Sequence, residues 1–245
     1  MKSLTRGGSV EARTLIERQI RRWNRIDAVL KKASPEKPLA EVSRRPVLTV
    51  SGSAGSGRER LAVALCKELD YELYGRELLD AVASDLHCQR MLLEGLDEKV
   101  QSNIRLIFES WLRGREIDHR EYISALFRVM GSLAERGGAV ILGRGGAFIL
   151  GAKAALRVRL EAPLPLRVRR TMESRKVSED EARHFVQTKD REQEEFLRRY
   201  FHSEASDPLA FDLAINTERI EPEKAVGIVL SALAQRGIEI RKPAI

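Results

Sequence analysis

Five short apolar segments recur along the chain, each separated from the next by a longer stretch with helical spacing. They are Val47–Val50, Tyr71–Tyr74, Ala139–Leu142, Leu156–Leu160 and Asp212–Ile215. Short apolar runs bounded by turn residues are typical of strands that are buried on both faces, as in parallel sheets covered by helices. Strands that alternate with helices in this way predict a five-stranded parallel sheet in an α/β fold.

The segments between these strands place apolar residues at helical spacing. The helix predicted after the first strand buries Leu61, Ala62, Leu65 and Leu69, and the one after the second strand buries Leu78, Leu79, Val82 and Leu86. Two further stripes, from Val100 to Trp111 and from Tyr122 to Leu133, predict an all-helical insertion before the third strand. Ser178 and Glu181 have the spacing of a capping box and open a highly charged helix that runs to about Tyr200.

The N-terminal segment, residues 1–33, predicts a basic amphipathic helix outside the α/β domain. Ile16, Ile20, Trp23 and Ile26 recur at helical spacing, with arginines between them. Three prolines within residues 34–46 predict a linker, so the α/β domain takes residues 47–237 and residues 238–245 form a C-terminal tail. We expect the helix to dock on its own domain or on a second subunit; contact with a membrane surface or nucleic acid is the alternative.

Composition narrows the class of protein. Forty-three Lys and Arg against 36 Asp and Glu give a net charge of +7, which favours polyanionic ligands such as nucleotides without selecting among them. No apolar run approaches the roughly 20 residues of a spanning helix, and the N-terminus lacks the apolar stretch of a secretory signal, so we expect a cytoplasmic protein. Cys66 and Cys88 lack metal-ligand spacing. Nucleic acid is a weak candidate partner because no aromatic-basic strand motif or recognition-helix pattern is present.

The strongest chemical signal is the glycine-rich segment Gly52–Arg58, which follows the first strand and precedes a helix. This order of strand, glycine turn and helix is the context of a phosphate-binding loop. Glycines let the backbone wrap closely round a phosphate with its N–H groups inward, and the helix N-terminus adds positive charge. Arg58 stands where such loops have a lysine, and Glu59 where they have a hydroxyl. A glycine turn without a ligand is the structural alternative.

Arginines elsewhere in the domain add to this signal. Arg144 lies in the turn Gly143–Gly146 directly after the third strand. Ligands of open α/β sheets bind at the carboxyl ends of strands, so Arg144 is predicted to pair with a nucleotide phosphate. The arginine-rich stretch from Arg167 to Arg191 predicts a lid over a transferring phosphoryl group, with Arg170 and Arg191 as the better candidates. An ordinary turn and a solvated charged helix are the respective alternatives.

Together these segments resemble the cytidylate kinase-like family of phosphate-loop proteins, a branch of the nucleoside monophosphate kinases. The resemblance covers about residues 46–235. The motifs that support it, besides the loop, are Tyr74-Gly-Arg-Glu-Leu78, Val140-Ile-Leu-Gly-Arg-Gly145, Ala162-Pro-Leu164, the helix from Ser178 to Arg191, Asp207-Pro208 and Phe211–Thr217. Each motif is modest by itself, whereas their order along the chain is specific.

The resemblance implies a three-layer P-loop NTPase-like fold with a five-stranded parallel sheet, a helical insertion and a lid. It implies ATP and Mg²⁺ as phosphoryl donor and metal, and phosphoryl transfer to CMP or a similar nucleotide. The residues implied for the donor phosphates are Gly52, Ser53, Ala54, Gly55, Ser56, Gly57 and Arg58. Arg76 and Arg144 are implied for the acceptor, and Arg58, Arg170 and Arg191 for catalysis, with no metal-ligating side chain assigned.

Two departures from the family pattern keep a second hypothesis open. The family's loop commonly reads Gly-Ser-Gly-Gly-Arg-Glu, and Arg58 replaces one glycine of that run. The acid expected after the second strand is replaced by Gly75, with Glu77 as the nearest carboxylate. The alternative is therefore a non-catalytic nucleotide-binding or regulatory module with a degenerate loop, which engages a protein partner or self-associates through the N-terminal helix.

Overall fold

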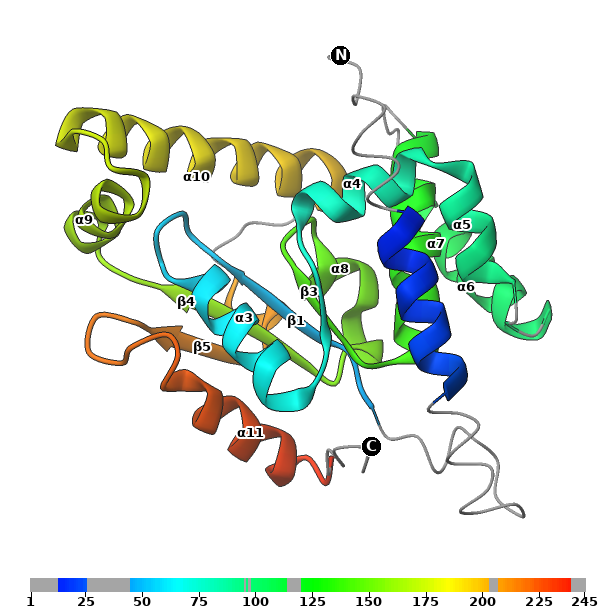
Figure 1. Cartoon of the computed structure of the whole chain (residues 1–245). Coiled ribbons are helices and arrows are strands. Elements are labelled where there is room, and N and C mark those ends of the chain that lie inside the picture. The colour runs from blue at the N-terminus through cyan, green and yellow to red at the C-terminus, as the bar shows by residue number, and fades with distance from the viewer. Residues whose placement is uncertain are drawn as a thin grey trace. The chain divides into compact units, whose positions relative to one another are not determined.

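The computed structural model describes residues 13–25, 45–94, 96, 98–113, 120–202 and 207–238 (Figure 1). The chain divides into two compact units. One unit, here called the sheet unit, comprises Leu48–Leu73 and Val140–Ile238; the other, the helical unit, comprises Met1–Val47, Tyr74–Ala139 and Glu239–Ile245.

The predicted sheet is confirmed. Its strands are β1 (Leu48–Gly52), β2 (Glu72–Tyr74), β3 (Ala139–Leu142), β4 (Leu156–Glu161) and β5 (Leu213–Asn216), in the order β2-β3-β1-β4-β5. β1 runs parallel to both β3 and β4, and β4 runs parallel to β5. β1 therefore lies in the middle of the sheet, where Leu48 and Val50 are buried. All three of these pairs bring their carboxyl ends to one edge, as ligand sites of open sheets require.

In its described residues, the sheet unit has five α-helices: α3 (Arg58–Leu69), α8 (Gly146–Leu150), α9 (Leu164–Arg175), α10 (Glu179–Phe201) and α11 (Ala225–Gln235). α3 and α8 pack on β1, and α11 packs on α3 and β4. The predicted apolar face of α3 is buried. α9 and α10 form a hairpin (Figure 1). The predicted capping box opens α10, and its hydrogen bonds from Ser178 lower the pKa of Glu181 below its ordinary value.

The insertion is all-helical, as predicted. α4 (Arg76–Ser84), α5 (Leu86–Leu93) and α6 (Glu98–Leu112) each pack against α7 (Arg120–Arg136). The prediction that Leu86 belongs to the buried face of one helix is wrong, because this side chain is 74% exposed. Asp85 ends α4, and its carboxylate accepts hydrogen bonds from the amides of His87 and Cys88, so a new helix begins there.

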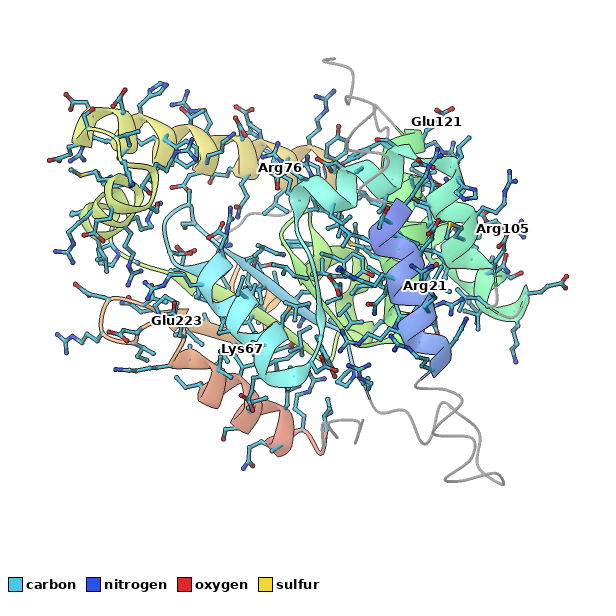
Figure 2. The ribbon with its side chains drawn as sticks, in the orientation of Figure 1. Arg21, Lys67, Arg76, Arg105, Glu121 and Glu223 are labelled. Atoms are coloured by element: carbon cyan, nitrogen blue, oxygen red, sulfur yellow. The ribbon has the colours of Figure 1, made fainter. Side chains whose placement is uncertain are left out.

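The N-terminal helix is described over residues 13–25 and packs within the helical unit. Ile16 and Trp23 are buried, and the Trp23 indole Nε1 donates to the Gly137 carbonyl at 3.2 Å. Arg13 forms an ion pair with Asp85 at 2.8 Å, while Arg21 lies on the exposed face (Figure 2). The helix thus contacts its own chain through its apolar face. The rest of the predicted helix, most of the linker and nearly all of the tail lie outside the described residues.

Candidate nucleotide site

The glycine-rich loop between β1 and α3 adopts a backbone that its glycines alone permit. Gly55 and Gly57 have φ values of 78° and 90°, in the left-handed region, and Gly57 is the N-cap of α3. At Gly52, φ is 151°, and an added Cβ would lie 2.2 Å from the Leu160 carbonyl oxygen. The loop therefore begins close to the neighbouring strand β4 and ends at the N-terminus of α3, where the helix dipole is positive.

Polar groups from the end of β5 and from α9 fasten the loop to the sheet. The Ser56 carbonyl accepts a hydrogen bond from the Thr217 hydroxyl at 2.7 Å and another from Arg170 Nη1 at 3.2 Å. Arg170 also donates to the Thr217 hydroxyl at 2.9 Å and to its carbonyl at 2.8 Å. Burial, together with the positive charges of Arg60 and Arg169, lowers the pKa of Arg170. The structure thus brings Arg170 to the loop, where it binds backbone rather than facing outward.

Arg58 points back across the loop that it follows. Its Nη1 donates to the Gly52 carbonyl at 2.5 Å and to the side-chain oxygen of Gln193 at 2.7 Å, and its Nε pairs with Glu59 at 2.9 Å. Glu59, at the position of the usual hydroxyl, is therefore engaged with the neighbouring cation. Arg58 reaches α10, so its side chain lies between the loop and the hairpin of α9 and α10.

A carboxylate from α10 occupies one loop amide. Asp190 Oδ1 accepts a hydrogen bond from the Ala54 amide at 2.9 Å, and Oδ2 pairs with Arg167 Nη1 at 2.6 Å. Arg167 also donates to the Ala54 carbonyl at 3.1 Å. Of the loop N–H groups predicted to face a phosphate, that of Ala54 is bonded to Asp190. Arg191, the predicted lid residue beside it, is exposed.

The turn after β3 holds Arg144 in an unusual conformation. Gly143, Arg144 and Gly145 have φ values of 77°, 49° and 69°, three successive left-handed residues. A left-handed backbone costs a residue other than glycine about 1 kcal/mol or more, and such strain is concentrated at functional sites. The Gly143 amide donates to the Val50 carbonyl at 3.0 Å, which joins this turn to β1. Arg144 lies over the ring of Phe196, 5.3 Å from its centroid.

Aromatic side chains pack against the turn Gly143–Gly146. The Phe201 ring is buried, and a Cβ added to Gly145 would lie 2.5 Å from it. Phe148 stacks on Phe201 with ring centroids 5.4 Å apart, and Phe196 lies 5.9 Å from Phe201. Phe196 and Phe201 both belong to α10, so this helix contacts both glycine turns.

A model of the cytidylate kinase-like family matches residues 47–219. The chain belongs to this family. An uncharacterized protein of the same fold from Eubacterium ventriosum ATCC 27560 is 22% identical, with a TM-score of 0.60 over 78% of this chain and 99% of that one. Shikimate kinases from Bacteroides thetaiotaomicron and Acinetobacter baumannii, the latter solved with shikimate, are 14% and 16% identical, with TM-scores of 0.42. They cover 77% and 82% of this chain and 98% and 100% of their own. No curated protein matches.

The cytidylate kinase-like family implies ATP and magnesium, and the residues present fit the two differently. The loop fits a phosphate chain, because Gly55 and Gly57 give it the left-handed turns of a phosphate-binding backbone and Gly57 opens the positive end of α3. The part of the chain that the structure describes has no group of three or more His, Cys, Asp or Glu side chains suited to a metal ion. Magnesium is commonly held by substrate phosphates and water with few protein ligands.

Arg76, the other residue predicted for the acceptor, opens α4 in the helical unit and is exposed (Figure 2). The sequence predictions missed Asp190, Gln193 and Phe196, which engage the loop, Arg58 and Arg144. Their three-residue spacing places them on one face of the predicted helix, but it does not show which face meets the loop. Every helix within the described part of the chain is too short or too polar to cross a bilayer.

Proposed function

We propose that this protein is a nucleoside monophosphate kinase that transfers a phosphoryl group from ATP to CMP or a similar nucleotide. The observation on which the proposal depends is the pair of glycine turns at the carboxyl ends of the adjacent strands β1 and β3. One turn precedes the positive end of a helix, and the other presents Arg144. Membership of the cytidylate kinase-like family supports the same reaction class.

The donor phosphates are assigned to the loop Gly52–Arg58. Backbone amides and the N-terminus of α3 favour negative charge at this position. Arg58 supplies the cation that a lysine supplies in most such loops, with a planar guanidinium suited to two phosphate oxygens. In the structure it is paired with Glu59 and Gln193, so binding of a phosphate would exchange these partners.

The acceptor phosphate is assigned to Arg144, with Arg76 as a second candidate. Arg144 is held in the left-handed region with its guanidinium against the face of Phe196. A planar guanidinium is suited to a bidentate contact with two phosphate oxygens. Phosphoryl transfer depends mainly on positioning and on stabilising the charge of the transferring group, which Arg58 and Arg191 would supply. Arg170 would keep the loop in shape through Thr217 and Ser56.

A panel of nucleoside monophosphates with ATP and magnesium tests the proposal through ADP release. We expect CMP or a close analogue to stimulate release, and Arg144→Ala to lower kcat/KM for the acceptor by about 100-fold, mostly through a higher acceptor KM. Arg58→Ala should lower kcat by a similar factor. Arg105→Ala, an exposed arginine of α6 (Figure 2), is the control and should change neither constant. If no common monophosphate stimulates ADP release, the kinase proposal is wrong.

A second candidate function is nucleotide binding without turnover. Two observations favour it: Glu59 replaces the loop hydroxyl, and Asp190 takes the Ala54 amide. This function predicts that ATP binds while none of the acceptors is phosphorylated. Turnover that disappears in Arg58→Ala would exclude it.

A further inference from the structure

One face of α10 contacts the glycine loop, Arg58 and Arg144. Asp190, Gln193 and Phe196 follow one another at intervals of three residues and so lie on neighbouring positions of one helix face. Asp190 accepts the Ala54 amide of the loop, Gln193 accepts from Arg58, and Phe196 lies under Arg144. We call these three residues the inner face of α10.

Asp190 makes the contacts that a phosphate would make at this loop. One of its oxygens accepts from a loop amide and the other from a guanidinium, so both oxygens of an anion are satisfied by a backbone N–H and an arginine. The Arg167 side chain is only 12% exposed and the Asp190 side chain 32%, so the pair is partly shielded from water. Anions bound at the start of a helix after a glycine loop use the same kinds of donor.

We infer that Asp190 is an internal substitute for phosphate, which a polyphosphate must displace before it can bind. After displacement, the Ala54 amide and the Arg167 guanidinium donate to the incoming anion instead of to the Asp190 carboxylate. Arg167 thereby becomes a phosphate-binding residue, in addition to Arg58. This inference deepens the proposed function and rests on it for the identity of the donor site, although the exchange itself requires only an anion in the loop.

The exchange would couple the hairpin of α9 and α10 to the loop. Arg167 belongs to α9 and Asp190 to α10, so the contact with Ala54 links both helices of the hairpin to the loop. When the carboxylate leaves, Gln193 on the same helix face shifts with it, and Arg58 loses that partner. The apparent affinity for phosphate is then reduced by the fraction of molecules in which Asp190 occupies the loop.

Calorimetric titration of the full chain with inorganic tripolyphosphate tests the inference. Asp190→Asn keeps the shape of the side chain but removes its charge, and we expect it to bind tripolyphosphate about tenfold more tightly than the natural chain. Glu194→Gln, an exposed residue of the same helix, changes the net charge equally and should alter the affinity less than about twofold. Arg167→Ala should weaken binding about tenfold, with or without Asp190→Asn.

Equal or weaker binding by Asp190→Asn would overturn the inference. Should that variant fail to fold, the natural chain decides: with ¹³C-labelled aspartate, the Asp190 carboxyl resonance should shift at saturating tripolyphosphate, and an unchanged resonance would equally overturn it. The readout is separate from turnover. Tighter binding by Asp190→Asn in a chain that phosphorylates no nucleotide would retain the exchange and reject the kinase, whereas turnover without tighter binding would do the reverse.

Discussion

The two glycine turns of the sheet unit are held in place by different kinds of contact. The glycine-rich loop Gly52–Arg58, here called the β1 turn, is held by polar contacts. They come from Thr217, Arg170, Asp190 and Arg167. The β3 turn is held by ring packing, since Gly145 lies against Phe201 and Arg144 against Phe196. They follow adjacent strands and are joined by the hydrogen bond from Gly143 to Val50.

This difference indicates which turn can rearrange. Hydrogen bonds and ion pairs to a loop can be exchanged for those of an incoming anion at little net cost, because each lost partner is replaced. Packed rings offer no such exchange, because moving them opens a cavity. We therefore expect the β1 turn to change its side-chain partners on binding and the β3 turn to keep Arg144 where it is.

The largest effect is expected at Gly52, which ends β1 and lies beside Leu160 of β4. Gly52→Ala should lower the free energy of unfolding by about 4 kcal/mol, because the new Cβ meets the Leu160 carbonyl oxygen at 2.2 Å and φ is 151°. Chemical denaturation measures this change.

Gly143→Ala in the β3 turn is the matched control. Its φ of 77° is also unfavourable, but an added Cβ meets no atom within 4 Å. This variant should lose only about 1–2 kcal/mol, the cost of the left-handed backbone. Equal losses for the two variants would show that close approach to β4 does not set the shape of the β1 turn.

A smaller loss of stability is expected when the hydrogen bonds of one side chain to the β1 turn are removed. Thr217 is buried, donates to the Ser56 carbonyl and accepts from Arg170. Thr217→Val removes both hydrogen bonds in a side chain of similar shape and should destabilise the chain by about 2 kcal/mol in chemical denaturation. Thr217→Ser retains the hydroxyl and should lose clearly less. If Thr217→Val is as stable as the natural chain, the hydroxyl does not hold the β1 turn.

The strands could be predicted from sequence because buried parallel strands are continuous apolar runs, and their ends differ by only one or two residues from the prediction. The break between α4 and α5 could not. Periodicity continues through Leu86, but the Asp85 carboxylate satisfies two amides and starts a new helix. A local cap therefore outweighed the apolar spacing, which placed Leu86 in solvent.

The site was predictable as far as the local backbone determines it. The loop and the Arg144 turn follow from glycines next to strands, and their conformations agree with that prediction. The partner of Ala54 lies 136 residues away in a helix crowded with charges. Composition does not distinguish Asp190 from its charged neighbours, because only the register of α10 against the loop decides which one faces inward. For the same reason the backbone partners of Arg170 could not be predicted.

The smallest change in stability is expected at Arg144, in the β3 turn. Arg144→Asn relieves the left-handed strain, since asparagine tolerates φ near 49°, and loses the contact with Phe196. These terms, about 1 kcal/mol each, should cancel, leaving the thermal midpoint nearly unchanged. Arg175→Asn loses a comparable contact, with Phe185 at 4.1 Å, from the ordinary backbone of α9, and should destabilise by about 1 kcal/mol. If Arg144→Asn destabilised equally, Arg144 would serve the fold, and its strained position would no longer indicate a binding role.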